Sequence, residues 1–322
     1  MDIKERIAEL KKKRNAVIVA HHYAPVEVHE VADVLSDSRG FVESIKKGFD
    51  ADVIVVIAPT FFAEVTASVL PDKIVLVPLK VECPVASHRD VQFDKVSDFK
   101  ALHSGIPLVC YATSPFQTKL LADAIALPGE VVQTIESINA DEVIFVGEKN
   151  CGEGAASSSR KKVILYPNNP ICNVYNAANI ADVRRLRKEY PDACLMVHPE
   201  CKPEVCEAAD HVIGTGAMYN DYINADNSIN TYILGTELGF YLRMKNEFPD
   251  KKFIHLSPYL HCNVFKVFRI ETICEALENM KEEIQPDKAV VSKIAPLFSS
   301  VFSIDPALSE PAILGDEAFL SY

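Results

Sequence analysis

The chain has 322 residues, of which 48% are hydrophobic, and its formal net charge at pH 7 is −12. This length and apolar content indicate a globular protein with a large core, and the acidic balance argues against general nucleic-acid binding. The longest apolar runs are far shorter than the roughly 20 residues of a membrane span, and the charged N-terminal segment has no apolar signal core. A cytoplasmic protein that does not enter the membrane is therefore expected.

Short β-branched runs alternate with helical patterns along the whole chain. Strands are expected, in chain order, at 16–23, 52–59, 73–78, 107–113, 142–148, 162–167, 194–200, 231–237 and 252–257. Patterns such as "EVADVLSDSRGFVESIKKG" and "ANIADVRRLRKEYP" lie between them and are typical of helices. Apolar strands that alternate with helices predict an α/β fold with parallel sheets covered on both faces.

One motif occurs three times, as "KIVLVPLKVEC" at 73–83, "KVILYPNNPIC" at 162–172 and "KFIHLSPYLHC" at 252–262. The closing cysteines are 89 and 90 residues apart. Another strand in each third ends on polar residues, in "AHHY", "CYATS" and "VHPE". These marks predict three similar αβα units of about 90 residues. Because ligands gather beyond the carboxyl ends of parallel strands, the three strand ends and three cysteines are expected to face one central cavity.

The repeat also predicts the domain boundaries. The first domain is expected at residues 1–100, with room for an exchange of terminal segments. The second is expected at 101–185 and the third at 186–285, followed by a C-terminal tail at 286–322.

The three repeated cysteines, Cys83, Cys172 and Cys262, are candidate metal ligands. The alternative is that they are inherited packing residues, since free cysteine is often buried as a small hydrophobe. Thiolates select zinc or iron–sulfur clusters, and a structural zinc site takes four protein ligands. The matching positions offer no fourth Cys or His. A [4Fe-4S] cluster held by three cysteines leaves one iron open as a Lewis acid for a substrate carboxylate or hydroxyl.

Several longer motifs resemble the quinolinate synthase family, over about residues 1–285: "AHHYAPVEVHEVADVLSDS", "CPVAS", "DACLMVHPECKPEV", "ADHVIGTGAM", "ILGTELGFYLRM" and "HCNVFKVFRIE". The resemblance implies three pseudo-threefold-related αβα domains and one [4Fe-4S] cluster with an open iron, held by one cysteine per domain. It implies condensation of iminoaspartate with dihydroxyacetone phosphate to quinolinate, with loss of phosphate and two waters, in NAD biosynthesis. It also implies small carboxylate and phosphate substrates, and an aspartate-oxidising enzyme as a partner.

Matched motif by motif, the resemblance assigns roles to single residues. The cluster ligands are Cys83, Cys172 and Cys262; the catalytic residues are His21, Tyr23, Tyr111, His198 and Glu200; the substrate-binding residues are Ser38, Thr113 and Thr215. Glu200 would move protons during dehydration and ring closure, a role that needs a pKa raised by burial. Structural alternatives are a backbone-bonded histidine for His21, a helix cap for Ser38, a core tyrosine for Tyr111 and an exposed loop acid for Glu200.

Four stretches depart from the family pattern. Thr113 stands where the family has asparagine, and Tyr175 where it has histidine. The segment "LPGE" at 127–130 places Pro128 at a substrate-binding serine and Glu130 at an asparagine. A proline offers neither hydroxyl nor N–H, and a glutamate repels a dicarboxylate or a phosphate.

The fourth departure adds Arg39, which is expected to face a substrate carboxylate if the anion site has been rebuilt. Two other functions stay open beside quinolinate synthesis. One is a cluster-bearing paralogue that dehydrates or condenses a different small carboxylic acid. The other is a non-catalytic iron–sulfur sensor or scaffold.

Overall fold

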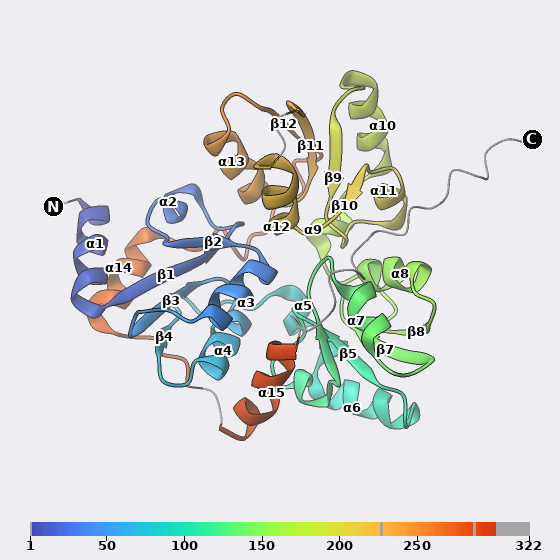
Figure 1. The fold of residues 1–322 in the computed structure, drawn as a ribbon, viewed down its shortest axis with the longest axis horizontal. Helices are drawn as coiled ribbons and strands as arrows, with labels where there is room; N and C mark the ends of the chain where they lie inside the picture. Colours follow the sequence, from blue (N-terminus) through green and yellow to red (C-terminus); the bar gives the residue numbers. More distant parts are fainter. Residues whose placement is uncertain (1, 226–227, 286–287, 301–322) are drawn as a thin grey trace, which may run out of the picture.

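The computed structural model describes residues 2–225, 228–285 and 288–300. Their strands form three four-stranded parallel sheets, ordered β2-β1-β3-β4, β6-β5-β7-β8 and β10-β9-β11-β12. The strand order is the same in each sheet, which confirms the predicted α/β class and the threefold repeat. Figure 1 shows the three sheets in separate lobes that meet near the short helices α5, α9 and α12.

Each repeat alternates strands with helices. The first contains α1 (Ile3–Arg14), β1 (Ala16–His21), α2 (Val26–His29), β2 (Val34–Ser36), α3 (Ser38–Lys47), β3 (Val53–Ile57), α4 (Thr60–Val69), β4 (Ile74–Leu76), α5 (Pro84–Ser87) and η1 (Arg89–Val91). The second contains α6 (Phe93–Leu102), β5 (Leu108–Tyr111), η2 (Thr118–Leu121), β6 (Ala124–Ala126), α7 (Val131–Ser137), β7 (Glu142–Val146), α8 (Lys149–Ser158), β8 (Lys162–Tyr166) and α9 (Asn173–Asn176). The third contains α10 (Ile180–Glu189), β9 (Cys194–Val197), α11 (Pro203–Glu207), β10 (His211–Val212), α12 (Thr215–Ala217), the π-helical turn η3 (Met218–Ile223), β11 (Thr231–Gly235), α13 (Leu238–Glu247) and β12 (Lys252–His255).

Local sequence explains the central strands and the helices that follow them. The five aliphatic residues of β3 are all buried, as expected for a strand covered on both faces. Glu148 and Glu237 are the N-cap residues of α8 and α13, and each side chain accepts a backbone N–H of the first helical turn. In the first repeat the residue before α4 is Pro59, whose side chain accepts no hydrogen bond.

An aspartate holds the start of the first strand in every repeat. Asp33, Asp123 and Asp210 accept the backbone N–H of Ile18, Leu108 and Leu195, at 2.8, 2.8 and 2.7 Å. Each aspartate also pairs with a basic residue of the helix before that strand: Lys11, Lys100 or Arg187. The recurrence of this contact makes the three repeats comparable residue by residue.

Strand register then aligns the residues at the opposite ends of the strands. Ala20 pairs with Ile57, Cys110 with Val146, and Val197 with Gly235, at the ends of β3, β7 and β11. The residues that follow on the first strands are therefore equivalent: His21, Tyr111 and His198, and two positions later Tyr23, Thr113 and Glu200.

After the third repeat the chain returns to the first. Helix α14 (Ile270–Asn279) packs on α1, where Arg14 donates to the carbonyls of Leu277 and Glu278. Helix α15 (Lys288–Ser300) packs against α4. The expected domain boundaries at 100, 185 and 285 stay a prediction, and residues 301–322 of the expected tail lie outside the described residues. Among the described residues, no helix has both the length and the apolar content needed to cross a membrane.

Candidate active site

A cavity of about 670 Å³, partly open to solvent, is lined by residues of all three repeats. Every site residue expected from the sequence lines it except Tyr111, which is fully buried and contacts Glu200. The expected site residues among its lining are His21, Tyr23, Ser38, Cys83, Thr113, Cys172, His198, Glu200, Thr215 and Cys262. Their placement follows from the shared topology, since each comes from the carboxyl end of a strand or from the loop after it.

Glu200 and Tyr111 form a buried acid–phenol pair. The Tyr111 hydroxyl donates to Glu200 Oε1 at 2.7 Å, and Glu200 is only 5% exposed. Burial, reinforced by the charge of Glu148, raises the pKa of Glu200 to about 7. A carboxyl group with this pKa can accept or donate a proton near neutral pH. The alternative of an exposed loop acid is therefore wrong for Glu200.

The two strand-end histidines share one geometry. His21 Nδ1 accepts the backbone N–H of Tyr23, and His198 Nδ1 accepts that of Glu200, both at 3.3 Å. Burial lowers the pKa of each imidazole to about 3, so both are neutral at physiological pH. A neutral ring that accepts at Nδ1 carries its proton on Nε2, which leaves an N–H donor.

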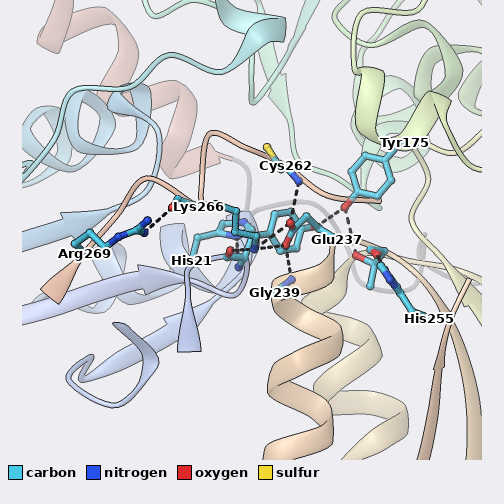
Figure 2. A network of polar contacts seen from close by, with 10 residues as sticks. His21, Tyr175, Glu237, Gly239, His255, Cys262, Lys266 and Arg269 are labelled. Atoms are coloured by element: carbon cyan, nitrogen blue, oxygen red, sulfur yellow. Dashed lines mark hydrogen bonds and ion pairs between the residues drawn. The ribbon is translucent and has the colours of Figure 1, made fainter. Parts of the chain in front are cut away.

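Tyr175 is a site residue that the sequence marked only as a departure. It lines the cavity, and its hydroxyl lies 2.5 Å from that of Tyr23 and 3.3 Å from Thr236 Oγ1. Its ring stacks on His198 with a centroid distance of 4.3 Å. Figure 2 shows Tyr175 directed into a network that also contains His21, Glu237 and Cys262. Tyr175 therefore joins the first and third repeats at the cavity wall.

Carboxyl, imidazole and hydroxyl groups line the polar part of the cavity. Among the described residues that line it, none is a lysine or arginine. The hydroxyl of Thr113 is buried and has no hydrogen-bond partner among the described residues, and that of Thr215 is buried beside the hydroxyl of Tyr23. Ser38 is the first residue of α3, and Asp37 caps that helix, so the helix-cap alternative is wrong for Ser38. The three side chains are placed to bind polar groups of a ligand.

Two of the residues that differ from the family pattern, Pro128 and Arg39, are placed differently with respect to the cavity. Pro128 lines the cavity, in the loop that follows the second strand of its repeat. Arg39 does not line it; its guanidinium binds Glu43 and Glu130 instead. In this structure Arg39 therefore does not face the cavity, because its guanidinium is directed at Glu43 and Glu130.

The three repeated cysteines are the feature that could hold a cluster. Cys83 and Cys172 each precede a short helix, and backbone N–H groups at 85–86, 175 and 264–265 oppose the rise in the pKa of the three thiols. Burial raises the pKa of all three thiols, that of Cys83 to about 12. A bound cationic group is therefore needed to ionise them.

The three thiols are the donor type that an iron–sulfur cluster takes. Among the described residues, no three Cys, His, Asp or Glu side chains are close enough together to hold one metal ion. All nine cysteines are free thiols, and these three line one cavity. Iron–sulfur clusters take thiolate ligands, and hydrogen bonds to the sulfur atoms tune them.

Comparison with known proteins supplies the family. The sequence model described as "Quinolinate synthetase A protein" matches residues 5–299. The chain belongs to the quinolinate synthase family. Proteins named quinolinate synthase are 36% identical over 280 residues in Dehalococcoides mccartyi (strain CBDB1) and 36% over 294 residues in Pyrococcus abyssi (strain GE5 / Orsay). These alignments cover 87% and 91% of this chain and 90% and 96% of the relatives.

A third relative agrees. The quinolinate synthase of Geotalea uraniireducens (strain Rf4) is 38% identical over 281 residues, covering 87% of this chain and 90% of its own length. The coverage of each quinolinate synthase extends over all three repeats. The protein is therefore an enzyme of this family.

Proposed function

We propose that the protein is a quinolinate synthase that condenses iminoaspartate with dihydroxyacetone phosphate and carries one [4Fe-4S] cluster on Cys83, Cys172 and Cys262. One observation carries the proposal: the three repeated cysteines and the Glu200–Tyr111 pair belong to one site lined by all three repeats. Quinolinate, phosphate and two waters account for all atoms of the two substrates, so the reaction needs no external oxidant or reductant. When bound, the cluster would supply a Lewis acid at its open iron.

The residues of the chain would bind the substrates and move protons. Glu200, with its pKa of about 7, accepts a proton from carbon while water leaves, and Tyr111 holds the carboxylate in place. Thr113, Thr215 and Ser38 bind substrate oxygens through their hydroxyls. The Nε2–H groups of the neutral histidines donate to polar atoms of the intermediate, because their Nδ1 atoms are occupied by backbone N–H groups.

A supply of iminoaspartate is part of the proposal. This imine hydrolyses in water, so an aspartate-oxidising enzyme must produce it near the cavity. We place both enzymes in the cytoplasm.

A second candidate function is the condensation or dehydration of a different small carboxylic acid. Pro128 in the cavity wall favours it, because this residue presents no hydrogen-bond donor to a substrate carboxylate. For a phosphate-bearing substrate, the lack of a lysine or arginine among the described lining residues points the same way.

An anaerobic assay distinguishes the candidates. The full chain is reconstituted with iron and sulfide, both are counted per polypeptide, and quinolinate formation from the two substrates is measured. The proposal expects one cluster per chain and quinolinate. A full cluster without quinolinate supports the second candidate, and a protein without an iron–sulfur cluster contradicts both.

Single-cysteine variants test the ligand set. Cys172→Ser should lose the cluster, whereas Cys201→Ser should keep it because Cys201 is fully buried in the core and does not line the cavity. The reverse result would contradict the assignment. A sensor or scaffold would hold a full cluster, catalyse no turnover, and tolerate Glu200→Gln without any phenotype.

A further inference from the structure

Two buried glutamates hold the main chain of two candidate cluster ligands. Glu148 and Glu237 each lie two residues after the third strand of their repeat, and both are fully buried. Glu148 Oε2 accepts the N–H of Cys172 at 2.7 Å, and Glu237 Oε1 accepts that of Cys262 at 2.9 Å. The other oxygen of each carboxylate accepts an N–H at the start of the following helix. The same contact thus occurs independently in two repeats.

Residues next to these glutamates, in sequence or in space, also hold the candidate catalytic loop of another repeat. Asn150, two residues after Glu148, donates Nδ2–H to the carbonyl of Glu200 at 3.1 Å. Lys266 forms an ion pair with Glu237 and donates to the carbonyl of Tyr23 at 2.7 Å. Figure 2 shows Glu237 between Cys262, Gly239 and Lys266.

The first repeat lacks this arrangement. Pro59 occupies the equivalent position, so Cys83 has no carboxylate from this turn. Phe61 stands where Asn150 and Gly239 stand in the other repeats, and it packs in the hydrophobic core instead of contacting a loop through a polar group. Cys83 is therefore an internal reference for any effect that acts through Glu148 or Glu237.

We propose that Glu148 and Glu237 are positioning residues, which fix Cys172 and Cys262 for cluster binding and tie each cysteine to a catalytic loop. Glu148 ties Cys172 to the loop of Glu200, and Glu237 ties Cys262 to the loop of Tyr23. The proposal deepens the proposed function and rests on its cluster. Ligands that are already fixed lose less conformational freedom when the cluster binds.

Glutamine substitutions test the proposal with little change in shape. Each carboxylate accepts N–H groups on both oxygens, whereas a glutamine must point its NH₂ group at one of those donors. Glu148→Gln and Glu237→Gln are made singly in the full chain and reconstituted anaerobically. Iron release to a chelator should become on the order of 10-fold faster in each, because outer partners of metal ligands typically have effects of this size.

Asp123→Asn is the matched control. Asp123 also holds a backbone N–H with a carboxylate, but at the opposite end of the strand from the cavity. This variant should lower the unfolding midpoint and leave iron release unchanged. Wild-type release in both glutamine variants, or equal acceleration in Asp123→Asn, would overturn the proposal.

Cysteine alkylation of the cluster-free protein gives a second readout. Iodoacetamide labelling, followed by mass spectrometry, should be faster at Cys172 in Glu148→Gln and at Cys262 in Glu237→Gln, with Cys83 unchanged. A loosened loop raises the rate at every pH, whereas a purely electrostatic effect only shifts the rate–pH profile. A rate–pH profile that is only shifted along the pH axis, or equal changes in labelling rate at all three cysteines, would overturn the proposal. If the alkylation rates change as expected but the wild-type protein holds no cluster, the result contradicts only the proposed cofactor and not the positioning role of the two glutamates.

Discussion

At the scale of single residues, the site contains ionisable groups whose charged forms are destabilised by burial. Glu200 is buried next to the Tyr111 hydroxyl, and the pKa of its carboxyl group rises to about 7 through burial and the charge of Glu148. The same burial keeps His21 and His198 neutral. Reactivity here follows from burial, because each group is held away from the water that would stabilise its charged form.

Glu200→Gln should abolish proton transfer and keep the shape of the side chain. Turnover is expected to fall by about 10²- to 10⁴-fold, the usual contribution of a positioned acid or base. Iron and sulfide content should stay at the wild-type level, which separates loss of catalysis from loss of the cluster. Turnover within twofold of wild type, in a protein with a full cluster, would show that another group moves the proton.

Glu130→Gln should change the pH dependence of stability. Burial raises the pKa of Glu130 to about 6, although Arg39 opposes the rise. Because this value exceeds the ordinary 4.5, wild type loses stability as the pH rises through 6, and below 4.5 no loss occurs. The variant should gain about 1–2 kcal/mol over wild type at pH 8 and nothing below pH 4.5.

Urea unfolding midpoints between pH 4 and 8 measure this difference. Glu207→Gln, at an exposed position, serves as the control and should stay within about 0.5 kcal/mol of wild type at every pH. A Glu130→Gln protein that is less stable than wild type at pH 8 would mean that the Arg39 ion pair outweighs the cost of burial.

At the scale of elements, the strand-to-helix turns set the position of the loops that carry the candidate catalytic residues. In the third repeat, Gly239 of such a turn lies directly against the main chain of Tyr23. A Cβ added to Gly239 would lie 2.6 Å from the carbonyl oxygen of Tyr23 and 2.7 Å from its carbonyl carbon. Two backbone segments meet here, so neither can move aside without displacing a strand end.

Gly239→Ala should therefore displace the Tyr23 loop. We expect a lower melting temperature and a reduced kcat, since the obstacle is backbone and not a flexible side chain. Gly154→Ala is the matched control: Gly154 lies exposed in α8, and an added Cβ meets no atom within 4 Å. That change should stabilise the helix by about 0.5–1 kcal/mol. Equal melting temperatures for the two variants would contradict the close contact.

At the scale of the whole molecule, polar contacts of α3 and the turn before it join the repeats. Asp37 accepts the N–H of Gly216 in the third repeat at 2.7 Å, and Arg39 binds Glu130 in the second. Both contacts lie beside residues that line the cavity, Ser38 and Thr215 among them. The relative placement of the repeats and the shape of the site are therefore linked.

Arg39→Gln tests whether this arginine holds the repeats or binds substrate. Its side chain is 52% exposed, so the loss in unfolding free energy should be at most about 1 kcal/mol and should shrink at high salt. The KM for each anionic substrate should stay within twofold of wild type, because Glu43 and Glu130 already occupy the guanidinium. A tenfold rise in KM would place Arg39 at the substrate after all.

The sequence predicted the parts of this arrangement that repeat. The matched cysteines and polar strand ends gave the three sheets and the shared cavity, because one topology brings equivalent positions to one side. The contacts of Tyr175 with Tyr23, and of Arg39 with Glu130, could not be predicted, since they depend on how one repeat faces another. Glu148 and Glu237 could have been found, because each follows its strand by two residues in "VGEKN" and "LGTEL".

The threefold frame has a consequence for how a ligand is oriented. A cage with three identical walls would accept an asymmetric molecule in three orientations of equal energy, and only one of them could react. Ser38, Pro128 and Thr215 follow the second strand of their repeats and all face the same space, yet only two carry a hydroxyl. Pro128 thus offers a carboxylate no hydrogen-bond donor at the position where the other two repeats offer a hydroxyl, and this difference leaves the bound molecule a preferred direction.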